Sequence, residues 1–162
     1  MIAPVIRILL AVALALVCSP ASAQAVVALW DPAYVAVRPG ASVKVMIIAT
    51  IQPGHVLVAQ QPQGGQLLPL SLRLRSAPHI TVGTPIYPAA EEARTGPEER
   101  EVTGYTGTLR IAVPISVSNR APAGELQLHG ELLYQACNRR GCFKPRSLPV
   151  RLPIDVQAAR AL

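Results

Sequence analysis

Several segments of this chain alternate apolar and polar residues with a period of two, and this pattern constrains the fold more than any other feature. The alternating segments are 43–51, 68–75, 109–117 and 148–156, and residues 126–134 are expected to form a further strand. Side chains at alternate positions point to opposite faces of a β-strand, so the pattern predicts antiparallel strands with one buried face. The sixteen prolines exclude long helices, and no segment after residue 23 has helical periodicity.

Turn-forming dipeptides separate these segments: Pro39-Gly40, Pro53-Gly54, Gly64-Gly65 and Ala123-Gly124. Seven to nine short strands in about 130 residues predict an all-β fold, an immunoglobulin-like antiparallel β-sandwich. Its core must be aliphatic, because Phe143 is the only phenylalanine and Trp30 the only tryptophan. Pro149 and Pro153 share one face of the last strand, which predicts that this strand lies at the edge of its sheet.

The first 23 residues have the pattern of a cleaved secretory signal peptide. Arg7 supplies a positive charge, the ten residues Ile8–Val17 are all apolar, and Ala21-Ser22-Ala23 matches the cleavage pattern. An apolar run of ten is too short to span a bilayer, which needs about 20 residues. Cleavage leaves residues 24–162 as a single periplasmic domain. A lipoprotein modified at Cys18 is the alternative, which the preceding Val17 disfavours.

The net charge of the chain indicates which classes of partner it could bind. Removal of Arg7 lowers the formal net charge from +6 to +5. A basic exported domain favours acidic protein surfaces or anionic lipid headgroups, although general solubility explains the charge equally well. No basic stripe is interleaved with aromatic residues, so nucleic acid is not an expected partner. No second apolar run approaches membrane-spanning length, so we expect a mature chain without a transmembrane segment, and a monomer.

The segment Tyr134–Pro145 reads YQACNRRGCFKP and holds the only two cysteines that remain after cleavage, Cys137 and Cys142. Four cationic residues lie in or next to it: Arg139, Arg140, Lys144 and Arg146. Residues 138–141 are predicted to form the turn of a hairpin, in which Gly141 tolerates a positive φ. The cysteines would then face each other with Cα atoms about 4.5–5.5 Å apart, a separation that permits a disulfide.

This cysteine pair has a redox interpretation and a structural one. A disulfide closing a loop of about six residues stabilises a protein by only about 2 kcal/mol, against nearly 5 kcal/mol for a loop of about a hundred. Neighbouring cations favour the thiolate, which is the form that attacks and leaves in disulfide exchange. These arguments favour exchange over the alternative, a non-catalytic immunoglobulin-like binding module with a structural disulfide.

A metal site built from the two cysteines and His129 is a weaker hypothesis. Cys-x4-Cys is not a usual zinc spacing, and Met46 is the only methionine of the mature chain. We therefore expect neither a metal nor another cofactor. His55 and His79 are interpreted as structural residues at the starts of strands.

Residues 89–101 interrupt the alternating pattern. The segment reads AAEEARTGPEERE and has five glutamates, two arginines and no apolar residue larger than alanine. This composition predicts a solvated loop, and the alternative is a mobile loop that folds over a functional site.

The segment YQACNRRGCFKP resembles the cysteine segment of the N-terminal periplasmic domain of the thiol:disulfide interchange protein DsbD. Three further segments resemble that family in the same order, and the resemblance extends from about residue 35 to residue 156. They are Pro53-Gly54-His55-Val56, the stretch LLPLSL at 67–72 and the stretch VGTPIYP at 82–88.

The resemblance implies an immunoglobulin-like fold with a redox-active cysteine pair. By position, Cys142 would form the mixed disulfide with a partner and Cys137 would resolve it. Tyr134 and Phe143 would pack around the sulfur atoms, and the region 91–101 lies near the family's cap loop. Residues 98–102 contain no aromatic side chain, so Tyr105 would have to supply the ring that usually covers the disulfide.

The resemblance also implies partners. The full family protein continues into a membrane domain and a thioredoxin-like domain, whereas this sequence ends at Leu162. Electrons would therefore come in trans from a thioredoxin-like protein or a membrane reductase. They would pass to oxidised periplasmic thiol proteins, including those that serve cytochrome c biogenesis.

Overall fold

A computed structural model describes residues 25–30, 34–62 and 66–158, and the predicted signal peptide, Cys18 and the Gly64-Gly65 turn lie outside them. Within these ranges the regular structure consists of thirteen strands and no helix, so no helix there is long and apolar enough to cross a membrane. The strands are β1 (Val27–Leu29), β2 (Val35–Val37), β3 (Ser42–Ile51), β4 (Val56–Val58), β5 (Ser71–Leu74), β6 (Ile80–Val82), β7 (Glu91–Thr95), β8 (Arg100–Tyr105), β9 (Thr108–Val117), β10 (Gly124–Tyr134), β11 (Ala136–Asn138), β12 (Gly141–Cys142) and β13 (Arg146–Val156). The expectation of seven to nine strands was too low, because several strands have only two or three residues.

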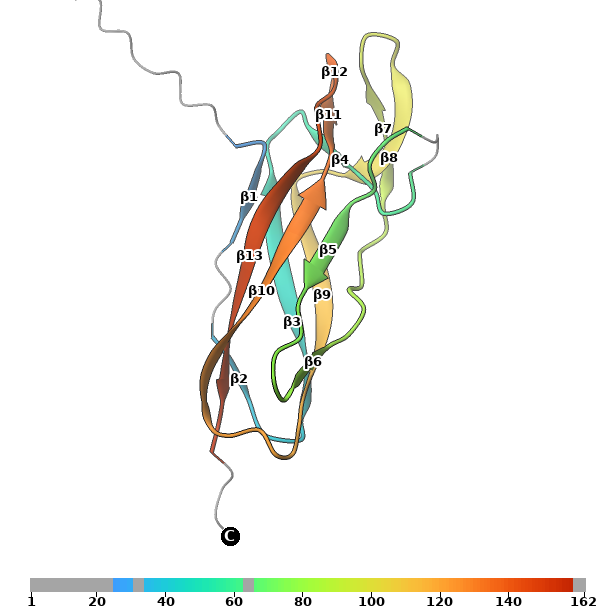
Figure 1. Cartoon of the computed structure of the whole chain (residues 1–162). Coiled ribbons are helices and arrows are strands. Elements are labelled where there is room, and N and C mark those ends of the chain that lie inside the picture. The colour runs from blue at the N-terminus through green and yellow to red at the C-terminus, as the bar shows by residue number, and fades with distance from the viewer. Residues whose placement is uncertain (1–24, 31–33, 63–65, 159–162) are drawn as a thin grey trace, which may run out of the picture.

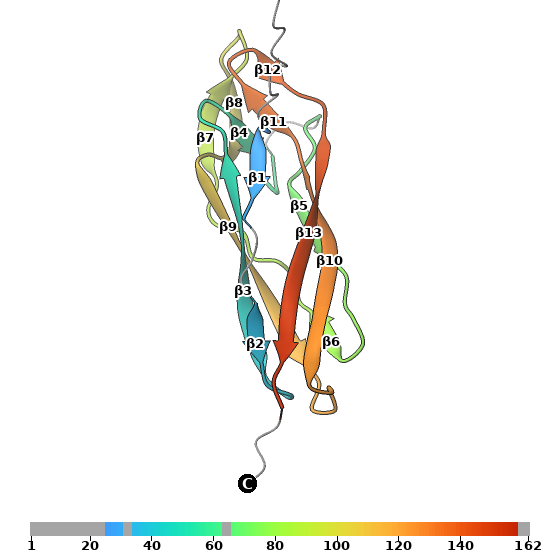
Figure 2. The ribbon, with the colours of Figure 1, turned by 90° about the vertical axis from the view of Figure 1, so that its left-hand side faces the viewer.

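Two four-stranded sheets form the layers of a sandwich, with strand orders β1-β3-β9-β6 and β2-β13-β10-β5. Figure 2 shows the two layers edge-on. Antiparallel ladders dominate both: β3 pairs with β9 over nine positions, and β10 pairs with β13 over eleven. The predicted all-β sandwich is therefore confirmed.

The core lies between these two sheets and is aliphatic, as the composition required. The inward residues of β3 and β9 are those that the period-two pattern selected, from Val45 to Ile51 and from Leu109 to Val117. Leu128, Leu132 and the inward residues of β13 supply the opposite face. The turns at Pro39-Gly40 and Pro53-Gly54 are also present, with φ of 78° at Gly40 and 77° at Gly54.

The prediction of an edge position for the last strand is only partly correct. β10 pairs with β13 along its whole length, and β2 pairs in parallel with Ile154–Val156 on the other side. The last three residues of β13 therefore have a paired strand on both sides. Pro149 and Pro153 come before this stretch and, among the described strands, have a paired strand on one side only. On the β2 side neither proline is paired with a neighbouring strand, which is the kind of position in which a sheet tolerates proline.

A third sheet, of five strands in the order β12-β11-β4-β8-β7, caps one end of the sandwich. Figure 1 shows it beyond the ends of β10 and β13. The chain passes from β10 into β11 at Gln135, whose carbonyl oxygen accepts a 3.0 Å hydrogen bond from the Val58 amide of β4. The cysteine segment therefore belongs to this third sheet.

Candidate functional site

A disulfide joins Cys137 of β11 to Cys142 of β12, and the two residues are directly opposite each other in the hairpin. We call residues 136–142 the cysteine hairpin. Its turn is formed by Arg139 and Arg140, with Gly141 at φ 132° and the Arg140 amide donating a 2.8 Å hydrogen bond to Asn138 Oδ1. The predicted hairpin is confirmed, with a Cα–Cα separation of 3.9 Å that is shorter than expected.

The two sulfur atoms have different environments. Cys137 is fully buried, packed in a small apolar cluster with Val58, Val102 and Leu67. Cys142 lies on the terminal strand of the third sheet and is exposed. A reagent or a partner protein therefore has access to the disulfide through Cys142.

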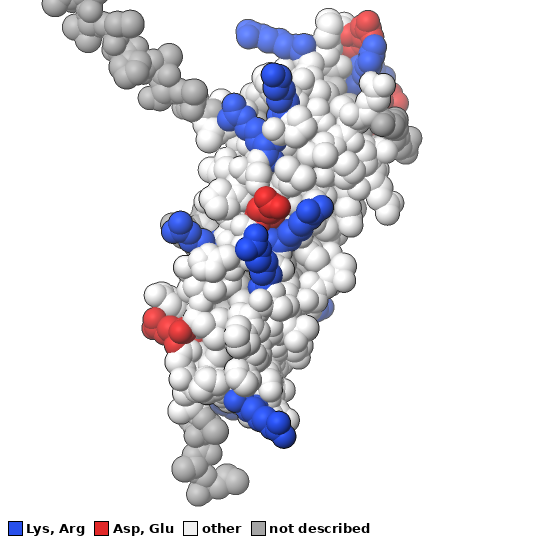
Figure 3. Space-filling view, in the orientation of Figure 1, with Lys and Arg blue, Asp and Glu red and all other residues white. Residues whose placement is uncertain are grey.

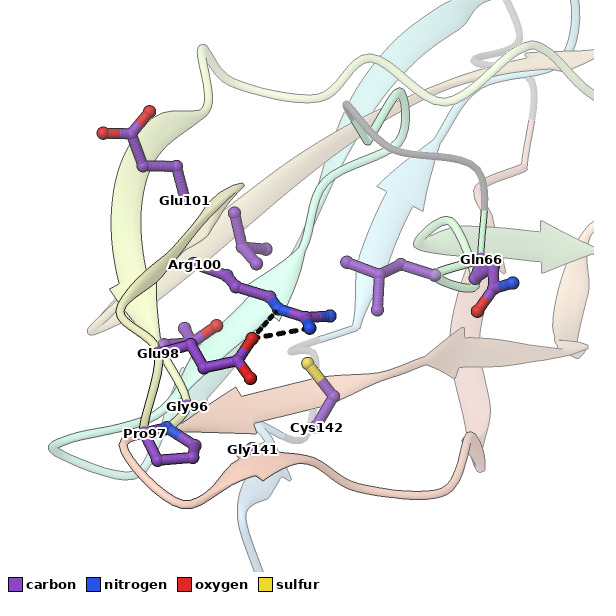
Figure 4. Close-up of a pocket in the computed structure, with 11 residues that line it drawn as sticks. Gln66, Gly96, Pro97, Glu98, Arg100, Glu101, Gly141 and Cys142 are labelled. Carbon is purple, nitrogen blue, oxygen red and sulfur yellow. Dashed lines mark hydrogen bonds and ion pairs between the residues drawn. The ribbon is translucent and has the colours of Figure 1, made fainter.

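A hollow of about 640 Å³ lies between Cys142 and the hairpin formed by β7 and β8. Figure 4 shows the Glu98 and Arg100 side chains extending from that hairpin toward the Cys142 sulfur, with Gln66 on the opposite wall. Glu98 Oε2 accepts hydrogen bonds from Arg100 Nε at 2.8 Å and is 2.6 Å from Arg100 Nη2. A charged pair thus occupies the place in which the family resemblance implied an aromatic ring.

The acidic segment 89–101 is a β-hairpin, so the solvated-loop prediction was wrong. β7 and β8 pair over five positions, and their tip joins the cysteine hairpin through a 2.8 Å hydrogen bond from the Gly96 amide to the Asn138 carbonyl. Gly104 of β8 permits the close approach to β4, because a Cβ atom at this position would collide with the Leu57 carbonyl oxygen. The segment does lie beside the site, as the alternative required.

His55 directly precedes β4 and has structural contacts, as expected, and its partners in the cysteine hairpin were not predicted. Its ring stacks on Phe143 with centroids 5.7 Å apart, and its Nε2 lies 3.3 Å from Asn138 Nδ2. Successive side chains of a strand point to opposite faces, so Asn138 and Phe143 lie on the face opposite the two sulfur atoms. Phe143 therefore braces the hairpin through His55.

Gln135 was also missed, although it stands in the motif. Its Oε1 accepts a 2.7 Å hydrogen bond from the Leu68 amide, and its Nε2 donates a 2.9 Å bond to the Phe143 carbonyl. The amide side chain thereby links three segments around the hairpin. Its place in the motif, between Tyr134 and Ala136, was the signal in the sequence that could have indicated this role.

Tyr134 and Tyr105, the other two aromatic candidates, belong to the main core. Burial raises the pKa of Tyr134, while the nearby charge of Arg146 acts in the opposite direction. Tyr105 donates a 3.2 Å hydrogen bond to the Pro88 carbonyl, and burial, with a smaller effect of Tyr87, raises its pKa. Tyr105 is not among the residues that line the hollow beside Cys142.

His129 lies on the outer face of β10, opposite Arg151 of β13 and in a different sheet from the cysteines. Within the described ranges no three histidine, cysteine or acidic side chains gather in an arrangement suited to a metal ion. His79 is also remote from the cysteine hairpin in the fold, with its carbonyl accepting a bond from the Ser118 amide.

Comparison with known proteins identifies related domains. The family model for the N-terminal part of the thiol:disulfide interchange protein DsbD matches residues 23–152. The N-terminal periplasmic domain of ScsB from Proteus mirabilis has a similar structure, with a TM-score of 0.50 and 15% identity. That match covers 74% of this chain and 43% of the ScsB chain, so this chain spans less than half of it.

The DsbD N-terminal domain of Neisseria meningitidis in its reduced form gives a TM-score of 0.45 at 19% identity, covering 72% of this chain and 82% of that one. At these identities the structural likeness shows the fold alone. Curated protein sequences give no match.

Proposed function

The chain belongs to the family of N-terminal domains of the thiol:disulfide interchange protein DsbD, and on that premise we propose that it exchanges thiols and disulfides through Cys137 and Cys142. The observation that carries the proposal is the contrast between the two cysteine residues: Cys137 is fully buried, whereas Cys142 is exposed and lines the hollow. A disulfide that serves only to hold a hairpin together has no need of an exposed sulfur beside a hollow.

The two cysteines have separate roles in this exchange. In the reduced protein the Cys142 thiolate attacks a sulfur of the partner's disulfide, and a mixed disulfide forms as the partner's other sulfur leaves as a thiolate. Cys137 then attacks Cys142, which restores the intramolecular disulfide and releases the second partner thiol. The direct pairing of Cys137 with Cys142 in the hairpin supports this step, because no large movement has to bring the sulfurs together.

The wider context follows from the family. Electrons would come from a thioredoxin-like protein or a membrane reductase and pass to oxidised thiol proteins of the periplasm, including those of cytochrome c biogenesis. This location requires residues 1–23 to act as a signal peptide, which the sequence pattern supports.

The reduction potential of the Cys137–Cys142 couple, equilibrated with glutathione, tests the proposal. A value above about −250 mV is expected, because such a couple exchanges with other thiol proteins. A value below about −300 mV is typical of structural disulfides, and it would support the binding module with a structural disulfide instead.

Single cysteine variants test the assignment of roles. The reduced Cys137→Ser protein should form a stable mixed disulfide, visible on a non-reducing gel, with a thioredoxin-like protein that retains one active-site cysteine, activated as a disulfide with 2-thiopyridine. The Cys142 thiolate attacks the partner sulfur, 2-thiopyridone leaves, and no second thiol remains to break the new bond. The Cys142→Ser protein should not form this adduct, because its remaining sulfur is buried. Adducts of equal yield on both variants would refute the assignment.

A further inference from the structure

The surface around Cys142 carries an uncompensated positive charge. Arg139, Arg140, Lys144 and Arg146 are all exposed, and no described acidic group lies within ion-pair distance of them. The sequence from 134 to 147 contains no acidic residue at all. In Figure 3 basic side chains gather over the end of the molecule that holds the cysteine hairpin.

The neighbouring β7–β8 hairpin has the opposite net charge, because it carries five glutamates and only two arginines, and both arginines pair with glutamates. Arg94 lies 3.5 Å from Glu99 and 3.7 Å from Glu101, and Arg100 pairs with Glu98. Both arginines are therefore already paired, and no described glutamate of this hairpin lies within ion-pair distance of the four cations. The uncompensated positive charge therefore lies on the cysteine-hairpin side of Cys142, whereas the β7–β8 side is acidic overall.

We propose that the exchange partner of Cys142 is a thiol protein with an acidic surface beside its own reactive sulfur. This inference rests on the proposed exchange function and specifies the class of partner. Any partner that forms a bond to Cys142 must lie against the residues next to it, and β12 is the terminal strand of its sheet, with one edge open. The partner's carboxylates would then face the four cations.

The residue types suit carboxylates in particular. Three of the four cations are arginines, whose planar guanidinium groups bind a carboxylate through two parallel hydrogen bonds. Complementary charge mainly raises the rate of encounter and rejects partners with like charge. We therefore expect selectivity in the rate of exchange, and we expect salt to reduce it.

A pair of peptides tests the inference. Each carries one cysteine as a mixed disulfide with 2-thiopyridine, flanked by glutamates in one peptide and by glutamines in the other. The Cys142 thiolate attacks the peptide sulfur and releases 2-thiopyridone, whose absorbance is followed. Attack by Cys137 on Cys142 then frees the peptide thiol, so the protein dithiol is oxidised as the peptide disulfide is reduced.

At low salt the reduced protein should react at least about tenfold faster with the glutamate peptide, and the ratio should approach one at about 0.5 M salt. The variant Arg139→Gln/Arg140→Gln/Lys144→Gln/Arg146→Gln should lose the ratio. Loss of these cations also lowers the thiolate fraction of Cys142, so its rates with neutral 2,2′-dithiodipyridine and with the glutamine peptide should fall by the same factor. The ratio between the two peptides therefore isolates the recognition of carboxylates from the reactivity of the sulfur. A matched variant, Arg38→Gln/Arg75→Gln/Arg120→Gln/Arg151→Gln, removes the same charge elsewhere and should keep the ratio.

Two results would overturn the inference while leaving the exchange function standing. One is an equal rate with both peptides. The other is equal loss of the ratio in both quadruple variants, which would assign the effect to net charge. Absence of a ratio together with binding to phosphatidylglycerol vesicles, lost in the first variant, would assign the surface to a membrane. If neither peptide releases 2-thiopyridone, the exchange function itself fails.

Discussion

The Gly96 amide donates a 2.8 Å hydrogen bond to the Asn138 carbonyl, and this bond joins the β7–β8 hairpin to the cysteine hairpin. The two hairpins therefore form one unit on either side of Cys142. Glu98 and Arg100, which pair with each other, line the hollow beside Cys142, so its described lining is charged on the β7–β8 side.

Substitutions in this pair should change the reactivity of Cys142 in opposite directions. Arg100→Gln removes a cation that lines the same hollow as Cys142, so alkylation of the reduced protein by iodoacetamide at neutral pH should slow about two- to threefold. Glu98→Gln removes the carboxylate that pairs with Arg100, and the alkylation of Cys142 should become faster by a similar factor. Arg94→Gln serves as the control, and a change of the same sign in both test variants would contradict the electrostatic explanation.

Loss of the His55 ring should weaken the support behind the disulfide. His55→Ala removes the stack on Phe143 and the contact with Asn138, and we expect a loss of about 1–2 kcal/mol in the free energy of unfolding. Urea denaturation of the oxidised protein measures it. The control His129→Ala, on an exposed sheet face, should stay within about 0.5 kcal/mol of the wild type. An equal loss of stability in both variants would show that the contacts of His55 do not stabilise the domain specifically.

Reduction of the disulfide should leave the domain folded. The closed loop is short, since Cys137 and Cys142 are five positions apart, so the expected loss is about 2 kcal/mol in the chain-entropy model. The two long ladders of the sandwich contain neither cysteine. Urea unfolding with and without a reductant measures the difference, and complete unfolding on reduction would indicate a structural disulfide.

The period-two pattern predicted the sandwich because its long strands are half-buried, which forces apolar residues into alternate positions. β7 escaped this prediction because the sequence EEART gives it only Thr95 as a buried side chain, and its pairing with β8 depends on backbone hydrogen bonds. His55 escaped it for a different reason. Its partner Asn138 is 83 positions away in the chain, and only the third sheet brings the two residues together.

Alkaline pH should destabilise the domain through its buried tyrosines. Burial raises the pKa of Tyr134 above its usual 10.0, so the folded state holds this proton more tightly than the unfolded chain. The stability that this pKa difference contributes is fully present below about pH 10, the pKa of the tyrosine in the unfolded chain. It is lost as the pH rises through the higher pKa of the folded state. Tyr134→Phe should therefore reduce the loss of stability between about pH 9 and pH 11, measured by urea unfolding.

Some alkaline loss should remain in this variant, because burial also raises the pKa values of Tyr87 and Tyr105. An unchanged pH profile in Tyr134→Phe would show that its hydroxyl does not titrate within this range.

The β10–β13 ladder ends at the pair formed by Tyr134 and Arg146. The intervening residues, 135–145, therefore leave the sandwich and return to it at one fixed point. Mutations in this insert can accumulate without disturbing the register of the eleven-residue ladder below it. Over evolutionary time, such a domain can acquire new partners by changing the charges around Cys142 while the same sandwich is inherited.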